Sequence, residues 1–131
     1  MKPPWCKLSF SIALYVHLGC WYSHSQRPNY AIKELEGKDK RLDGEYYATN
    51  PLQKPSKREN AIQKCYEVAR DRGYNYFGVN NGGHCVGSYD AEFRYKAYGK
   101  RTTCKNGKGG QWTTDVYFIV RESSKYLLAR L

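Results

Sequence analysis

The hydrophobic positions between Ser56 and Ser88 first follow the period of a helix and then that of β-strands. Apolar residues recur at spacings of three and four, which gathers them on one face of a helix; they are Ala61, Ile62, Cys65, Val68 and Ala69. The polar residues that point away from this face are Lys57, Lys64, Glu67, Arg70 and Asp71. Ser56 and Glu59 have the spacing of a capping box, so the helix is expected to start at about Lys57. Gly73 supplies the left-handed residue that ends such a helix.

Two short strands joined by a tight turn are predicted directly after this helix. Tyr74 to Val79 is rich in aromatic and β-branched residues, which favour a strand. The run from Asn80 to Gly83 tolerates positive φ and can reverse the chain. His84 to Ser88 is therefore expected to pair with the first strand.

Cys65 on the apolar face of the helix and Cys85 on the second of these strands are about twenty residues apart. A helix that covered the strand would place the two side chains well for a disulfide, which would constrain the unfolded chain by roughly 3 kcal/mol. Two buried thiols are the alternative.

Longer strands are predicted before and after this central unit. Tyr15 to Tyr22 has the composition of a strand that ends in Gly-Cys-aromatic. Gln111 to Val120 alternates regularly, so one side is expected to be buried and the other partly buried, and this strand is expected to close the sheet. Residues 23–55 are polar and interrupted by glycine and proline, which indicates a long surface excursion. Its middle is expected to be anchored to the core by a few apolar residues. Its apolar anchors are Ala31, Ile32, Leu35 and Leu42.

Together these elements predict an α+β fold, with one amphipathic helix packed on a small antiparallel sheet. A chain of 131 residues has room for one domain, which we place at residues 15–120. Thirteen tyrosines and three tryptophans with few leucines suit a small sheet with aromatic surfaces better than a helical bundle.

Both ends of the chain lie outside this domain. Residues 1–14 contain a short apolar run behind Lys2 and Lys7, which we interpret as a weak signal peptide or a truncated leader. Cys6 is the odd cysteine of this segment. The tail, residues 121–131, has apolar residues at helical spacing but no cap, and no role is assigned to it. No stretch is long enough to predict a transmembrane segment.

The chain is basic, with 22 Lys and Arg against 12 Asp and Glu and a formal charge of +10. Such a charge favours acidic partners, or serves only solvation. Six basic residues and no acidic residue lie between Phe93 and Thr114, and they form the predicted basic patch: Arg94, Lys96, Lys100, Arg101, Lys105 and Lys108. These basic residues are interleaved with aromatic residues, a composition found in proteins that bind single-stranded nucleic acid. We favour the alternative, an exposed sheet edge protected by lysine and arginine.

Catalytic motifs are missing from the sequence. The three histidines, His17, His24 and His84, do not form a zinc-binding motif, and no Cys-x-x-Cys is present. His84 stands beside Cys85, but neighbouring strand residues point to opposite faces, and a bridged cysteine is not a nucleophile. We predict no enzymatic activity, no metal site and no cofactor.

Short motifs of glycine, cysteine and aromatic residues occur in a set order along the chain. They are Gly19-Cys20-Trp21, residues 31–38, Leu42-Asp43-Gly44, Cys65 on a helix, residues 73–79 followed by Gly83-His84-Cys85, and residues 109–117. Together they resemble the WSC-like modules of extracellular proteins, and most closely a reduced variety with four cysteines in secreted and matrix proteins of marine invertebrates. Typical members have further cysteines, including a second one on the helix, where this chain has Ala69 and Asp71 nearby.

The resemblance implies two disulfides, Cys65 with Cys85 and Cys20 with Cys104. It also implies a secreted protein that binds carbohydrate. The residues offered as ligand-binding on this interpretation are Trp112, Asn80, Asn81, His84, Tyr89, Asp90 and Asp115, with Trp21 as a further aromatic platform. The alternatives are that Trp112 belongs to the core and that the two asparagines only form the turn.

Two classes of binding function follow. The first is a lectin, in which aromatic rings stack on sugars and polar side chains bind hydroxyl groups. The second is an adhesion or extracellular-matrix protein that binds sulfated polysaccharide, other polyanions or extracellular proteins through the basic patch. Nucleic acid is not expected as a partner, because bridged cysteines belong outside the cytosol. Binding by charge weakens with salt, whereas stacking on a neutral sugar does not, so ionic strength separates the two classes.

Overall fold

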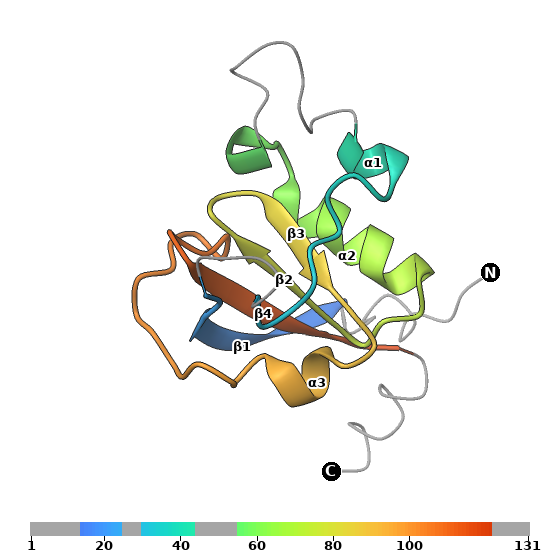
Figure 1. Cartoon of the computed structure of the whole chain (residues 1–131). Helices are drawn as coiled ribbons and strands as arrows, with labels where there is room; N and C mark the ends of the chain where they lie inside the picture. The colour runs from blue at the N-terminus through green and yellow to red at the C-terminus, as the bar shows by residue number, and fades with distance from the viewer. Residues whose placement is uncertain (1–13, 25–29, 44–54, 122–131) are drawn as a thin grey trace, which may run out of the picture.

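A computed structural model describes residues 14–24, 30–43 and 55–121 of the chain (Figure 1). Its centre is a four-stranded antiparallel sheet in the order β1-β4-β2-β3. The strands are β1 (Tyr15–Tyr22), β2 (Tyr76–Asn80), β3 (His84–Gly87) and β4 (Thr113–Ile119). The helices are α1 (Lys40–Asp43), α2 (Ala61–Asp71) and α3 (Ala91–Arg94), with a 3₁₀ turn at Pro55–Lys57.

The last strand lies inside the sheet and not at its edge. β4 pairs with β1 on one side and with β2 on the other, so the prediction that it closes the sheet is wrong. Its side chains explain the position, because Val116 on one face and Tyr117 and Ile119 on the other are all buried. A strand with apolar residues on both faces is stable where both faces are covered.

The α2 helix begins at Ala61, four residues later than the capping-box spacing predicts. Ser56 lies in the 3₁₀ turn, and Asn60 precedes the helix in a left-handed conformation with φ 51° and no side-chain cap. The reason lies in Arg58, which is buried and pairs with Glu36, so the chain before the helix follows the course that buries this guanidinium. The predicted end is confirmed, since Gly73 follows the helix with φ +80°.

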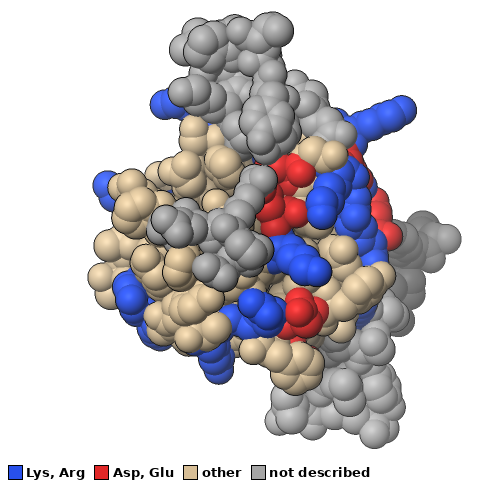
Figure 2. Space-filling model, viewed as in Figure 1, with Lys and Arg blue, Asp and Glu red and all other residues tan. Residues whose placement is uncertain are grey.

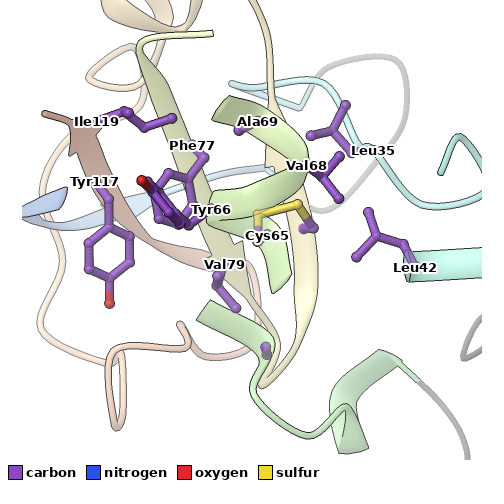
Figure 3. Close-up of a cluster of buried hydrophobic side chains, with 12 residues drawn as sticks. Leu35, Leu42, Cys65, Tyr66, Val68, Ala69, Phe77, Val79, Tyr117 and Ile119 are labelled. Carbon is purple, nitrogen blue, oxygen red and sulfur yellow. A yellow bond between two sulfur atoms is a disulfide. The ribbon is translucent and has the colours of Figure 1, made fainter. Parts of the chain in front are cut away.

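One face of the sheet and the apolar side of α2 contribute to the same core cluster (Figure 3). The buried helix residues are Ala61, Cys65, Tyr66, Val68 and Ala69. From the sheet come Phe77, Val79, Cys85, Tyr117 and Ile119. The structure contains the Cys65–Cys85 disulfide within this cluster, so the alternative of two buried thiols is wrong.

A smaller cluster covers the other face of the sheet. It contains Ile32, Val86, Ala91, Tyr95 and Val116, with Trp21 packed against it. The four predicted anchors of the polar excursion are confirmed as buried, because Ala31, Ile32, Leu35 and Leu42 all belong to the core.

Other parts of the chain run beside β3 and beside the end of β1. Beside β3, the Leu35 N–H donates to the Cys85 carbonyl at 2.8 Å, and the Gly87 N–H donates to the Lys33 carbonyl at 2.9 Å. Beside β1, the Tyr22 N–H donates to the Gly99 carbonyl at 2.9 Å. The segment before this contact forms α3 and a turn, so only residues 99–101 of the basic segment run along a sheet edge.

The second disulfide, Cys20–Cys104, joins β1 to the segment that precedes β4. Both pairings that the resemblance implies are therefore present. Cys6, the proposed leader and the tail from residue 122 onward lie outside the described residues. Within the described ranges, no helix is long and apolar enough to cross a membrane.

Candidate functional site

A pocket of about 310 Å³ lies at the end of the sheet where the β2–β3 turn meets the turn before β4. The described residues that line it are Ser23, His24, Tyr30, Asn80, Asn81, His84, Gln111 and Trp112. Four of the seven predicted ligand-binding residues therefore share one pocket, and they are Trp112, Asn80, Asn81 and His84.

Backbone hydrogen bonds bring these separate segments together. The β2–β3 turn is fixed to the loop before β4, since the Asn81 N–H donates to the Gly110 carbonyl at 3.2 Å and the Gly82 N–H donates to the Lys108 carbonyl at 2.8 Å. The end of β1 is fixed to the same loop, because the Ser23 N–H donates to the Trp112 carbonyl at 2.8 Å. The lining of the pocket is therefore held by main-chain contacts that do not depend on its side chains.

Trp112 is the largest exposed apolar group of this pocket. It lies in the turn that precedes β4, with φ 59°, and is 50% exposed. The N–H groups and carbonyls of Gly110 and Thr113 bond to each other across this turn at 3.1 and 3.2 Å. The alternative in which Trp112 is a core residue is therefore wrong, because the turn takes its ring out of the strand's alternation.

Polar side chains line the same pocket as the indole. Asn81 has φ 46° and forms the turn between β2 and β3, as predicted, and its exposed side chain also lines the pocket. The His84 ring lies with Nδ1 at 3.7 Å from Oε1 of Glu34. The amides of Asn80, Asn81 and Gln111 each offer both donors and acceptors.

Asp115 does not line the pocket, although it was predicted to bind ligand. Its side chain is buried and accepts a hydrogen bond from the Gly109 N–H at 2.8 Å. The other carboxylate oxygen lies 2.6 Å from Nε2 of His17. Asp115 is therefore a structural residue that holds the loop before β4.

Tyr117 holds the same loop from the neighbouring position on this face of β4. Its hydroxyl donates to the Gly107 carbonyl at 2.6 Å. Burial, followed by the negative charge of Asp115, raises the pKa of the Tyr117 phenol. The neutral phenol is therefore the stable form, and it keeps this hydrogen bond.

Tyr89 and Asp90 lie at a different pocket, of about 220 Å³. This second pocket is lined by Lys33, Glu34, Leu35, Lys38, Arg72, Tyr74, Gly87, Ser88, Tyr89 and Asp90. The Tyr89 hydroxyl donates to the Arg72 carbonyl at 2.9 Å, and the Ser88 hydroxyl donates to Asp90 at 2.6 Å. The structure thus divides the predicted ligand-binding residues between two pockets and the core.

Three residues of the predicted basic patch lie against aromatic rings. The Lys96 and Lys100 ammonium groups lie 5.8 and 5.9 Å from the centroid of the Trp21 ring. The Arg101 guanidinium carbon lies 4.8 Å from the centroid of the Tyr22 ring. Figure 2 shows Lys and Arg atoms along the left margin of the molecule, where the loop after α3 runs in Figure 1, with no Asp or Glu atoms beside them.

The other three residues of the patch are placed differently. The Arg94 guanidinium donates to the Ala31 carbonyl at 2.9 Å. Lys105 and Lys108 lie in the loop before β4 and bond to each other through main-chain atoms at 3.0 Å. The six predicted residues are therefore held by different kinds of contact.

Sequence reasoning missed Ser23, His24, Tyr30 and Gln111 as lining residues. Three of them belong to the polar excursion after β1, where no periodicity marks a position. Among the residues that the structure describes, no group of three His, Cys, Asp or Glu side chains is placed to hold a metal ion.

Comparison with protein-family models, with curated proteins and with solved structures finds no significant match for this chain.

Proposed function

We propose that the protein is an extracellular binding module for carbohydrate and that its site is the Trp112 pocket. The observation that carries the proposal is the half-exposed indole, held by its own backbone in a pocket lined with amide and imidazole groups. We propose kinship with WSC-like modules on the motifs described above, and this kinship supports the same function.

The chemistry of the lining fits a sugar ring. A sugar has an apolar face of C–H groups, which packs on a flat aromatic side chain, and a rim of hydroxyl groups, which both donate and accept hydrogen bonds. Trp112 offers the flat surface, and the amides of Asn80 and Asn81 offer both kinds of partner. A mostly apolar pocket with few polar groups suits other ligands better than it suits a sugar.

Binding without catalysis fits the same lining. Hydrolysis of a glycosidic bond commonly uses a pair of carboxylic acids on either side of the bond. No Asp or Glu side chain is among the described residues that line the Trp112 pocket.

The two disulfides are consistent with a secreted protein. They support the extracellular part of the proposal, because such bridges persist in oxidising compartments.

A glycan-array screen of the oxidised protein at low and at high salt tests the proposal. We expect binding to a neutral glycan that persists at high salt, because stacking and neutral hydrogen bonds are little screened. Trp112→Ala should weaken this binding by roughly tenfold or more, as loss of a buried aromatic contact does at a binding hot spot.

Two further variants sharpen the screen. Asn81→Gly removes one amide and keeps the left-handed turn, so it should weaken binding without loss of stability. Phe93→Ala is the matched control, because Phe93 is an aromatic residue of α3 that is 83% exposed and does not line the pocket. The proposal would be overturned if no neutral glycan showed salt-resistant binding. Equal binding by Trp112→Ala and Phe93→Ala would also overturn it.

A further inference from the structure

The Trp112 pocket continues into a row of aromatic rings beside the end of β1. His24 lines the pocket, and its ring centroid lies 5.3 Å from that of Tyr98 and 6.5 Å from that of Tyr22. The rings of Tyr22 and Tyr98 lie 6.3 Å apart. We call Tyr22, His24, Tyr98 and Arg101 the edge strip.

Arg101 places a positive charge at the far end of this strip. Its guanidinium lies over the Tyr22 ring, and Nη1 donates to the Lys100 carbonyl at 2.8 Å. No carboxylate of the described residues forms a salt bridge with Arg101, and the side chain is exposed. The ring and the carbonyl thus hold the guanidinium of an exposed residue in place.

The backbone pairing explains why cations lie on both sides of this edge. Residues 99–101 run beside the end of β1, with Lys100 opposite Trp21 and the Arg101 N–H bonded to the Cys20 carbonyl at 2.9 Å. Side chains of neighbouring residues in an extended segment point to opposite faces. Lys100 therefore lies over Trp21 on one face, and Arg101 lies over Tyr22 on the other.

We infer that the ligand is an acidic polysaccharide, which places one sugar ring on Trp112 and an acidic group of a sugar further along the chain on Arg101. The inference rests on the proposed function and specifies its ligand. Further sugar rings of the chain have Tyr22 and Tyr98 to pack on, and the cation at the end of the strip pairs with a sulfate or carboxylate. A neutral glycan would use the pocket and leave the strip's charge without a partner.

Binding to dextran, carboxymethyl dextran and dextran sulfate of equal length tests this inference, because the three chains share one backbone and differ in charge. Single-stranded oligo(dT) serves as the nucleic-acid arm. We expect both acidic dextrans to bind more tightly than dextran, and oligo(dT) to bind more weakly than dextran sulfate.

Arg101→Gln is the deciding variant, and Lys33→Gln is its control. Lys33 is an exposed cation beside β3, at the opposite edge of the sheet, and only its backbone carbonyl is bonded there. Arg101→Gln should weaken binding of the acidic dextrans by about fivefold at low salt and leave dextran unchanged, since one exposed charge contact is lost. Lys33→Gln should leave all three unchanged. Thermal melts of both variants check that the fold is intact.

The possible failures are distinguishable. Equal weakening of acidic dextrans by Arg101→Gln and Lys33→Gln, with neutral-glycan binding still lost in Trp112→Ala, overturns the edge strip and leaves the pocket. If oligo(dT) binds as tightly as dextran sulfate and with the same salt dependence, the site binds any polyanion and not specifically a polysaccharide. This result overturns the inference. If Trp112→Ala changes binding of no glycan, the pocket itself is rejected and the proposed function fails with it.

Discussion

Glu36 and Arg58 form an ion pair with no exposed side-chain surface. The Arg58 Nη2 donates to Glu36 at 2.5 Å and to the Leu42 carbonyl at 3.0 Å, and Nη1 donates to the Gly83 carbonyl at 2.7 Å. Glu36 in turn accepts from the Cys85 N–H at 3.0 Å. One pair of side chains therefore joins the long excursion, the segment before α2 and the β2–β3 turn.

Removing one member of this pair leaves a buried charge without its partner. Arg58→Met should lower the free energy of unfolding by about 3–5 kcal/mol. The exposed neighbour Lys57 is the control. Lys57→Met should change the free energy of unfolding by less than about 0.5 kcal/mol. Urea unfolding of the oxidised protein measures both.

The double variant Glu36→Leu, Arg58→Met separates the loss of the pair from the loss of a buried charge. It should cost less than the sum of the two single changes, because neither charge is then left alone. The Cys85 N–H and the two carbonyls still lose their partners, so full recovery is not expected. Additive costs would show that the ion pair contributes nothing as a pair.

Local sequence patterns predict apolar residues better than buried charges. Leu35 and Leu42 are apolar residues in an otherwise polar segment, and Cys65 lies on the apolar face of a predicted helix; all three are buried. No local pattern marks Glu36 and Arg58 as buried, since the burial of each depends on a partner 22 residues away. Asp115 is misread for a similar reason, because the loop N–H that it accepts becomes visible only in the folded chain.

At the scale of elements, periodicity predicts what is local. The buried face of α2, β1 and the β2–β3 hairpin are confirmed, with β2 shifted from residues 74–79 to Tyr76–Asn80. The order of strands is not local, so alternation in β4 does not show that β4 lies between β1 and β2. The same alternation includes Trp112, yet the chain turns there, and the candidate pocket depends on that turn.

The loop before β4 is an element whose shape the pocket requires, and Gly109 is its tightest position. Gly109 has φ +71°, and a Cβ there would meet the Thr113 carbonyl and lie 2.6 Å from Cα of Asn80. Gly109→Ala should therefore destabilise the fold by roughly 3 kcal/mol or more, since backbone atoms must move as well as adopt a strained φ.

Gly99 provides the matched control for this change. It also has a positive φ, +88°, but a Cβ there meets only the flexible end of Arg101 at 3.3 Å. Gly99→Ala should cost about 1 kcal/mol, the strain of the left-handed conformation alone. Thermal or urea unfolding compares the two, and equal costs would show that the loop before β4 can shift without loss.

At the scale of the whole molecule, the two disulfides differ in their surroundings. Cys65 and Cys85 have no exposed surface and lie inside the main core cluster. Cys20 and Cys104 are partly exposed and join segments 84 residues apart. The first bridge therefore reinforces a core that hydrophobic contacts already hold, whereas the second ties the basic segment and the Trp112 loop to the start of the sheet.

This difference predicts the order in which a thiol reductant opens the two bridges under native conditions. Cys20–Cys104 should open first, because a thiolate must reach a sulfur atom to attack it. The free energy of unfolding should then fall by roughly 4–5 kcal/mol, as expected for release of a loop of this length. Cys65–Cys85 should open only when the core unfolds.

Alkylation at timed intervals, followed by peptide mass mapping, gives the order in which the two bridges open. Urea unfolding of the singly reduced protein gives the loss in free energy of unfolding. Simultaneous opening of both bridges would mean that reduction proceeds through global unfolding, and that the exposure of Cys20 and Cys104 gives the reductant no earlier route.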